Sequence, residues 1–66
     1  MNVTLNGISI QLQANTSLLS LLEIKGLEPE RIVIEYNSNI LNKEEWGECV
    51  LKENDKVEVL SFVRGG

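Results

Sequence analysis

The residues best able to carry chemistry in this chain are the last two, Gly65 and Gly66, because few reactive side chains are present. The 66 residues include no histidine and one cysteine, Cys49, and no carboxylate pair is marked out by its spacing. General acid–base and nucleophilic catalysis depend on such groups, and zinc sites need clustered cysteine, histidine or carboxylate ligands. The sequence therefore predicts a protein that is not an enzyme, has no metal site and binds no cofactor of its own.

A glycine pair at a C-terminus allows two interpretations. Chain ends are often small and flexible, so the pair could be incidental. However, this pair comes after the last predicted strand, with no spacer of polar, disordered sequence between them. The α-carboxylate of Gly66 is a poor acyl donor until an enzyme brings it together with ATP and Mg²⁺ and converts it to an acyl-adenylate. Because Gly65 and Gly66 lack Cβ atoms, they can thread a narrow channel of such a partner enzyme.

Composition argues against several classes of function. The net charge is −4 and the acidic residues are dispersed, whereas nucleic-acid binding relies on clustered lysine and arginine. The acidity either serves solubility or steers the protein toward a basic protein surface. No stretch approaches the ~20 apolar residues of a membrane span, no signal peptide is apparent, and a single cysteine fits a reducing compartment. We expect a cytoplasmic protein that contacts neither nucleic acid nor membrane.

The elements that must position the C-terminus begin with a β-hairpin over residues 1–13. Apolar and polar residues alternate on both sides of Asn6-Gly7. This dipeptide is typical of a type I′ turn, in which both central residues need positive φ. The sequence therefore predicts two antiparallel strands at the N-terminus.

Residues 15–27 predict the main helix. Thr16 or Ser17 can act as the N-cap, Gly26 can supply the left-handed residue after the last turn, and Pro29 blocks continuation. The residues expected to face the core are Leu18, Leu21 and Leu22, with Leu19 and Ile24 beside them.

The middle of the chain predicts a strand over residues 31–36, followed later by a short helical turn over residues 43–46. Asn42 and Glu45 have the spacing of a capping box for that turn. We expect Trp46 to close the edge of the core with its indole N–H near water.

The last part of the chain predicts further extended segments. Residues 37–41 form a turn leading into a short segment, residues 49–51 a short strand, residues 52–56 a polar turn, and residues 57–63 the last strand. Cys49 is interpreted as a small apolar filler at the start of a strand.

This order of elements predicts an α+β fold of the β-grasp type. We expect a mixed sheet of four to five strands with one main helix packed across it. Residues 1–61 form the domain, and residues 62–66 form a flexible C-terminal tail that ends in the glycine pair.

The last strand also predicts a docking patch beside the tail. If Val57 and Val59 face the core, the two-residue period directs Leu60 and Phe62 to the opposite side. An exposed pair of this kind is typical of a partner-binding patch, although the helix or a neighbouring strand could instead cover both residues. Arg64 either pairs with an acidic groove of a partner or is solvated.

Four segments of the sequence are distinctive, namely "MNVTLNG", "VIEYNSNILNKEEW", "LKENDKVEVLSFV" and the terminal "RGG". Through them the chain resembles, over essentially its whole length, the ThiS family of sulfur carriers. The Gly-Gly end is shared by all ubiquitin-like carriers and modifiers. The stretch containing Asn37, Ile40 and Trp46, together with the short length, points more narrowly to the ThiS family.

This resemblance implies a mechanism and a set of partners. An adenylating enzyme of the ThiF type would activate the carboxylate of Gly66 with ATP and Mg²⁺. A cysteine-desulfurase relay would then supply sulfur, leaving Gly66 as a thiocarboxylate. Thiazole synthase would receive that sulfur as the thiazole ring of thiamin is built. On this interpretation Gly66 is modified, Gly65 and Arg64 enter partner active sites with it, and the protein is a cosubstrate.

Other functions remain open at this point. The small subunit of molybdopterin synthase has the same fold and end, and carriers in other sulfur pathways are equally compatible with the tail. A ubiquitin-like modifier would form an isopeptide bond with lysine, and Arg64 before the glycines is similar to the ubiquitin ending. A plain interaction module with incidental glycines is the alternative from a different class.

Overall fold

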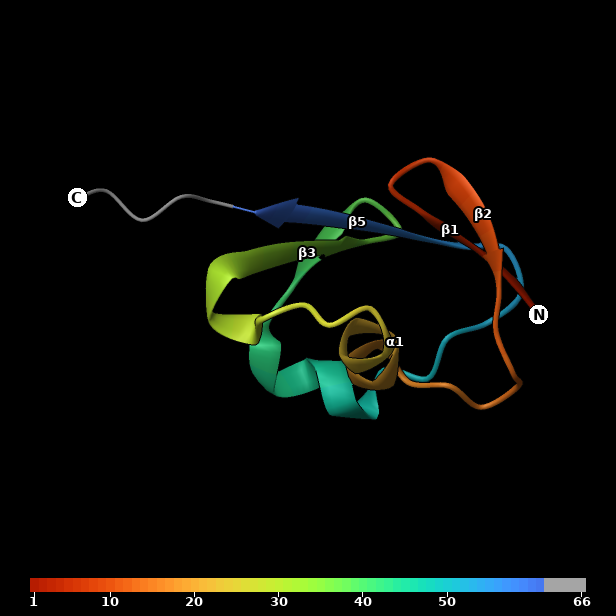
Figure 1. Ribbon diagram of the computed structural model, residues 1–66, viewed down its shortest axis with the longest axis horizontal. Helices are drawn as coiled ribbons and strands as arrows, with labels where there is room; N and C mark the ends of the chain where they lie inside the picture. Colours follow the sequence, from red (N-terminus) through yellow and green to blue (C-terminus); the bar gives the residue numbers. More distant parts are fainter. Residues whose placement is uncertain (62–66) are drawn as a thin grey trace.

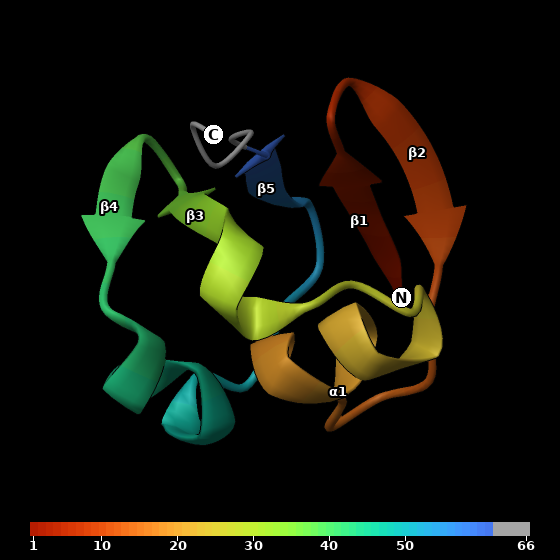
Figure 2. The same ribbon diagram turned by 60° about the vertical axis from the view of Figure 1, so that its left-hand side comes forward.

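The structure, a computed structural model, describes residues 1–61, and residues 62–66 lie outside its described part. A five-stranded sheet forms one layer, and helix α1 (Leu18–Ile24) packs across one of its faces (Figure 1, Figure 2). The strands are β1 (Asn2–Leu5), β2 (Ile8–Gln11), β3 (Ile32–Tyr36), β4 (Asn39–Leu41) and β5 (Asp55–Ser61). The predicted α+β architecture, with a mixed sheet and one main helix, is confirmed.

The last strand lies in the middle of the sheet. The strand order is β2-β1-β5-β3-β4. β5 pairs in parallel with β1 and antiparallel with β3, whereas each hairpin pairs antiparallel within itself. Figure 2 shows the two hairpins on opposite sides of β5. The sheet is therefore mixed because β5 is inserted between two local hairpins.

The first hairpin and the start of α1 confirm the local predictions. Asn6 and Gly7 have φ values of 49° and 81°, as a type I′ turn requires. Ser17, rather than Thr16, is the N-cap, and its hydroxyl oxygen accepts a hydrogen bond from the Ser20 N–H at 3.0 Å. This bond satisfies one of the amide groups that the first helical turn leaves unpaired.

The end of α1 is a Schellman motif. Gly26 has a φ of 71°, a conformation that glycine adopts without a steric penalty. The N–H of Gly26 donates to the carbonyl of Glu23 and the N–H of Leu27 donates to the carbonyl of Leu22, both at 3.0 Å. Leu27 packs against the core beyond this turn. The chain is thereby redirected before Pro29, which begins an unpredicted 3₁₀ turn, η1 (Pro29–Arg31).

The core lies between the sheet and α1, and Trp46 is its largest fully buried side chain. The expected position of its indole N–H near water is wrong. Trp46 is 2% exposed, and its Nε1–H donates to the carbonyl of Leu41 at 3.0 Å. A buried indole donor needs such a partner. The other buried apolar residues are Val3, Leu18, Leu21, Leu22, Ile32, Ile34, Leu51 and Val57.

Two strand predictions in the second half need correction. Residues 49–51 do not form a strand, since Val50 makes only an isolated bridge with Ser17. The fourth strand is instead Asn39–Leu41, which pairs with β3. It follows a tight turn in which Asn37 and Ser38 have φ values of 50° and 74°. The last strand also begins at Asp55, two residues before the predicted start.

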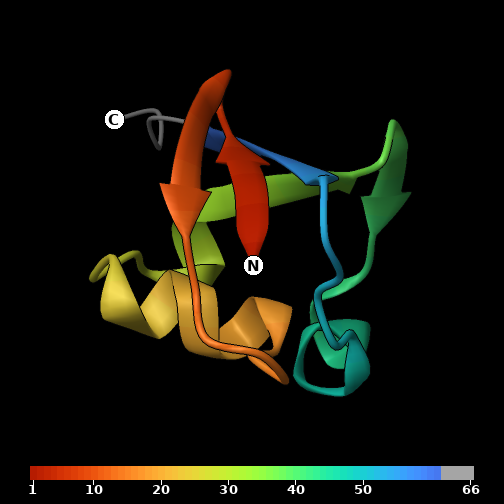
Figure 3. The same cartoon turned by 90° about the vertical axis from the view of Figure 1, so that its right-hand side faces the viewer.

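The capping box is confirmed, but the helical segment that it begins is longer than a single turn. Residues Lys43–Glu48 form a 3₁₀ helix, η2, which lies beside α1 (Figure 3). The Asn42 N–H donates to the Glu45 carboxylate at 3.3 Å, and the reciprocal bond of the box is also present. Cys49 follows η2 and is partly buried against the core, so it is not at the start of a strand. No helix within residues 1–61 has the length and apolar character needed to cross a bilayer.

Candidate functional site: the two ends of β5

β5 is the strand that leads toward Gly66, and its two ends are paired differently. Toward β3, it pairs from Val57 to Ser61. Toward β1, it pairs only from Asp55 to Val57. β5 therefore extends beyond β1, and its final described residues have a strand neighbour on one side only (Figure 1).

Asn6 holds β5 where β1 ends. The backbone N–H of Asn6 donates to the carbonyl of Val57 at 2.9 Å, and its side-chain Oδ1 accepts from the N–H of Val59 at 2.7 Å. Asparagine tolerates the left-handed conformation that the hairpin turn requires. Beyond the last β1–β5 pair, its side-chain oxygen accepts the hydrogen bond that a backbone carbonyl of β1 would otherwise accept. β5 is thus fixed on both sides as far as Val59.

Asn37 holds the opposite end of β5 from the other hairpin. Its backbone N–H donates to the carbonyl of Lys56 at 2.8 Å. Its Oδ1 accepts from the Lys56 N–H at 2.8 Å, and its Nδ2 donates to Oδ1 of Asp55 at 3.2 Å. Two turn asparagines, one in each hairpin, therefore hold the backbone of the central strand.

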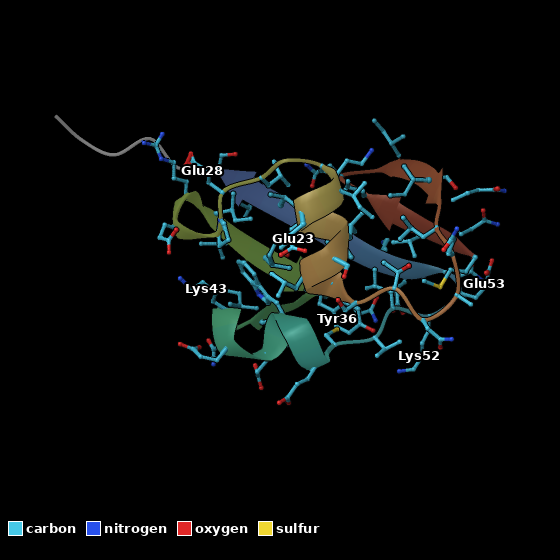
Figure 4. All side chains as sticks on the ribbon, turned by 60° about the horizontal axis from the view of Figure 1, so that its bottom comes forward. Glu23, Glu28, Tyr36, Lys43, Lys52 and Glu53 are labelled. Atoms are coloured by element: carbon cyan, nitrogen blue, oxygen red, sulfur yellow. The ribbon has the colours of Figure 1, made fainter. Side chains whose placement is uncertain are left out.

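Asp55 is a buried carboxylate with several hydrogen-bond donors. Its side chain accepts from the Tyr36 hydroxyl at 2.6 Å and from the Lys52 backbone N–H at 2.8 Å, in addition to Asn37. Asp55 is 7% exposed, and Figure 4 views the molecule from the helix side, where Tyr36 and Lys52 are labelled. Such a network compensates the loss of hydration that burial of the carboxylate causes.

These contacts shift the pKa values of the residues involved. Burial, the largest influence, raises the pKa of Asp55, but the hydrogen bonds from Tyr36, Lys52 and Asn37 together hold it below its ordinary value of 3.8. Burial raises the pKa of Tyr36, and its hydrogen bond to Asp55 raises it further. Burial also raises the pKa of the Cys49 thiol, which reduces its thiolate fraction. The hydrogen bonds that Asp55 accepts, including the one from Tyr36, give these two side chains a structural role.

The exposed end of β5 contains the one residue of the predicted docking patch that the structure describes. Val57 is fully buried and Val59 partly buried, whereas Leu60 is 51% exposed. Neither α1 nor a neighbouring strand covers Leu60, so the orientation inferred from the two-residue period is confirmed. The other predicted site residues, Phe62, Arg64, Gly65 and Gly66, lie outside the described residues, and their roles stay predictions.

The sequence interpretation missed the hydrogen-bonded residues at the start of β5. A signal was present, because stepping back by two from Val57 places Asp55 on the core side of the strand. A charged residue at an inward position requires hydrogen-bond partners, and Tyr36 is in register with Val57 on the neighbouring strand. Within residues 1–61, no three acidic, cysteine or histidine side chains gather as metal ligands would.

Comparisons with known proteins place this geometry in a family. The model of the ThiS family matches residues 3–66. The sulfur carrier protein ThiS of Bacillus subtilis is 33% identical over 63 residues, which cover 94% of this chain and 96% of the relative. The crystal structure of a thiamine biosynthesis protein (ThiS) from Geobacter metallireducens superposes with a TM-score of 0.83 at 32% identity, covering both chains completely.

A different kind of relative contains only a segment similar to this chain. A protein of Magnetococcus marinus named thiazole synthase is 36% identical over 66 residues, which make up all of this chain and 20% of that protein. A thiazole synthase of Paramagnetospirillum magneticum has the same coverage at 26% identity. This chain therefore spans about a fifth of the length of these two relatives.

Proposed function

The chain belongs to the ThiS family, and from that premise we propose that it carries sulfur for thiamin biosynthesis on the carboxyl group of Gly66. The proposal is carried by the family match, which extends through residue 66 and so includes the glycine pair. It is supported by the sulfur carrier of Bacillus subtilis, with which the similarity covers nearly all of both chains. On this proposal the protein is a cosubstrate of other enzymes.

The chemistry begins with activation of Gly66. A carboxylate oxygen attacks the α-phosphorus of ATP in a ThiF-type adenylating enzyme, so that pyrophosphate leaves and an acyl-adenylate forms. A persulfide of the cysteine-desulfurase relay then attacks the acyl carbon, so that AMP leaves and an acyl disulfide forms. A thiol attacks the relay sulfur of this disulfide and supplies the two electrons that release Gly66 as a thiocarboxylate. Thiazole synthase, a name that two relatives bear, accepts the sulfur. ATP and Mg²⁺ belong to the adenylating enzyme.

The described part of the chain supports this chemistry by fixing the point from which Gly66 is presented. Asn6 and β3 hold β5 at Val59, and Gly66 is the fifth residue beyond Ser61. A chain of five residues spans at most about 18 Å. An enzyme that acts on Gly66 must therefore approach the end of β5. Leu60, with Phe62, is proposed as the patch on which it docks.

The residues closest to the reacting group are assigned by their chemistry. Gly65 and Gly66 have no side chains to obstruct a narrow channel, and glycine adopts backbone angles that other residues avoid. Ordering the pair costs about 2–4 kcal/mol of backbone entropy, which docking of the domain must offset. Arg64 is proposed to enter the partner with the glycines and to meet acidic groups there.

Intact mass spectrometry tests the proposal. The protein is purified from its own host, or incubated with the adenylating enzyme, ATP and a cysteine-desulfurase sulfur source. We expect a species in which one oxygen of Gly66 is replaced by sulfur. A variant with one alanine added after Gly66 is the matched control, and it should stay unmodified while melting at the same temperature. A large drop in its melting temperature would instead assign the end a structural role.

Other outcomes of this experiment would favour different functions. If only the carboxylate is found with all components present, the carrier function is wrong. Lysine-linked conjugates of higher mass would identify a protein modifier. Stable co-purification with a large subunit that requires molybdopterin precursors would identify a molybdopterin synthase subunit.

A further inference from the structure

We infer that the free edge of β2 pairs with the same edge of a second copy of this chain, so that the protein forms a weak, symmetric dimer. In this dimer the two sheets join into one, with Ile10 of each copy at the two-fold axis. The pairing concerns the N-terminal hairpin and does not depend on the sulfur chemistry proposed for Gly66.

β2 has a strand neighbour on one side only, because it begins the strand order β2-β1-β5-β3-β4. Figure 2 shows it at the outer margin of the sheet, on the side away from β4. An open edge offers unpaired backbone groups to other chains, and native proteins commonly protect such an edge with lysine, proline or a bulge. Residues 6–13 contain no charged residue and no proline, and the register of β2 with β1 is continuous. This edge is therefore unprotected.

The hydrogen bonds of the hairpin decide which backbone groups face the open edge. The N–H of Leu12 donates to the carbonyl of Met1 at 2.9 Å, and the amino group of Met1 donates to the carbonyl of Leu12 at 2.7 Å. In an antiparallel pair, hydrogen-bonded positions alternate with positions that are not hydrogen-bonded. Ile10 is therefore bonded to β1, whereas the backbone groups of Ser9 and Gln11 point away from it. Both of these residues are exposed.

A second copy fits this edge in antiparallel orientation, with Ile10 opposite Ile10. Ser9 of each copy then lies opposite Gln11 of the other, and each of these two pairs exchanges two backbone hydrogen bonds. The same register places Ile8 of one copy opposite Leu12 of the other. The edge is thus complementary to itself in both its backbone groups and its apolar side chains.

The apolar side chains of this edge are incompletely covered in the single chain. Ile8 is 67% exposed, and Ile10 and Leu12 are only partly buried against the core. All three lie on the α1 side of the sheet, because Ile10 is opposite the buried Val3 of β1. Pairing therefore extends the existing core across the two-fold axis.

The distribution of charge favours a second copy as the occupant of this edge. The net charge is −4, and every charged side chain lies within residues 23–66. Two copies of an acidic protein repel each other, but the side chains of residues 1–22 do not contribute to this repulsion. The other edge strand, β4, has three residues and is soon followed by Lys43, Glu44 and Glu45. The β2 edge is thus the edge at which two copies meet with less repulsion.

The dimer leaves both C-terminal ends accessible. The two β5 strands are separated by β1 and β2 of each copy, a distance of about 24 Å at the usual interstrand spacing. They point in opposite directions, because the two β2 strands are antiparallel. Each copy can therefore present Gly66 to a partner enzyme of its own.

Sedimentation equilibrium of the purified chain tests the inference. Because β2 has only four residues, the interface is smaller than that of a stable dimer, and we expect a dissociation constant of about 0.1 mM. The protein should be mostly dimeric at about 1 mM and mostly monomeric at about 10 µM. Sodium chloride should strengthen the association, because it screens the repulsion between acidic copies. A monomer at about 1 mM, or association that weakens with salt as ion pairs do, would overturn the inference.

Ile8→Lys is the test variant, since lysine on an edge strand opposes pairing with another chain. We expect a dissociation constant at least about tenfold higher, with a wild-type melting temperature in dilute solution because Ile8 is largely exposed. Ile40→Lys is the matched control. Ile40 is also 67% exposed, and it lies on β4 at the other edge of the sheet, so this variant makes the same change of charge and should dimerise like the wild type. Equal association of the two variants would contradict pairing through β2.

A cysteine at the two-fold axis tests the register. In a Cys49→Ala background, Ile10→Cys places two thiols opposite each other at a separation that a disulfide can span. With oxidised glutathione as the oxidant, this variant should form a covalent dimer faster than Ser9→Cys in the same background. Ser9 is the more exposed residue, but it lies opposite Gln11 in the inferred register. Faster cross-linking of Ser9→Cys would overturn that register.

Discussion

At its first residue β5 is buried and held by hydrogen bonds from two side chains and one backbone N–H, whereas at its last described residues it is exposed and paired on one side. Asp55 is 7% exposed and accepts hydrogen bonds from Tyr36, Asn37 and Lys52. Leu60 is 51% exposed, and beyond Val57 no pairing with β1 is present among the described residues. The first residue of β5 therefore contributes to stability, whereas its last described residues are accessible to a partner.

The difference shows how a small domain can present a reactive end without losing its fold. A chain of 66 residues buries only about 60% of the surface that its unfolded form exposes, so its stability is limited. Fixing β5 at Asp55, far along the strand from the exposed end, leaves the side chain of Leu60 exposed while its backbone stays paired with β3. Substitutions at the two ends should therefore separate stability from function.

The largest effect is expected for Asp55→Ala. The substitution leaves the Tyr36 hydroxyl, the Asn37 amide and the Lys52 N–H without their acceptor. We expect a loss of about 3 kcal/mol in the free energy of unfolding, measured by urea denaturation. Asp55→Asn keeps the size and one acceptor oxygen, and it should lose less. Near wild-type stability in Asp55→Ala would contradict the contrast between the two ends.

The next largest losses of stability are expected for substitutions of the two turn asparagines. Glycine accepts positive φ, so Asn37→Gly and Asn6→Gly keep the turns and remove only the side-chain bonds. Asn37 makes two such bonds with β5 and Asn6 makes one. At about 1 kcal/mol for each bond, we expect losses of about 2 and 1 kcal/mol in the free energy of unfolding. Equal losses would mean that the two ends of β5 are held equally strongly.

Acidification should lower the free energy of unfolding by less than these substitutions do. Protonation of Asp55 removes its charge but leaves both carboxyl oxygens in place. The pKa of Asp55 is lower in the folded protein than its ordinary value of 3.8. The stability that the ionised carboxylate contributes is therefore fully present above that value and is lost as the pH falls through the folded pKa. Urea denaturation between about pH 6 and pH 3 should show this loss in the wild type. Asp55→Asn should lack that component, and identical pH profiles would contradict the prediction.

The local elements could be predicted from the sequence where one residue type fixes the backbone. Asn6-Gly7 specified the first hairpin, and Gly26 specified the end of α1, because both positions need positive φ. The turn of the second hairpin was expected, but the strand that follows it was not, because β4 has only three residues. The turn residues, Asn37 and Ser38, adopt positive φ without a glycine. Such a turn is stabilised by contacts with β5 that become visible only in the folded chain.

The candidate site was predictable in its apolar part and not in its polar part. The exposure of Leu60 follows from the period of the strand, starting from Val57. The partners of Asp55 come from positions up to 19 residues away in the sequence, so their proximity depends on how β3 and β5 pair. The hydrogen bond from the Trp46 indole N–H to the Leu41 carbonyl likewise depends on tertiary packing. Spacing along the chain does not reveal such packing.

The smallest effect on stability, and the clearest test of the exposed end, is expected for Leu60→Ser. Leu60 is half exposed, and serine at such a surface position should change the free energy of unfolding by no more than about 0.5 kcal/mol. If Leu60 forms part of the docking patch, the same variant should still slow formation or transfer of the thiocarboxylate at Gly66. Ile24→Ser is the matched control, because Ile24 is 67% exposed at the end of α1. Equal rates for the two variants would show that the exposed end of β5 has no part in docking, whereas a slow, fully folded Leu60→Ser would locate docking there.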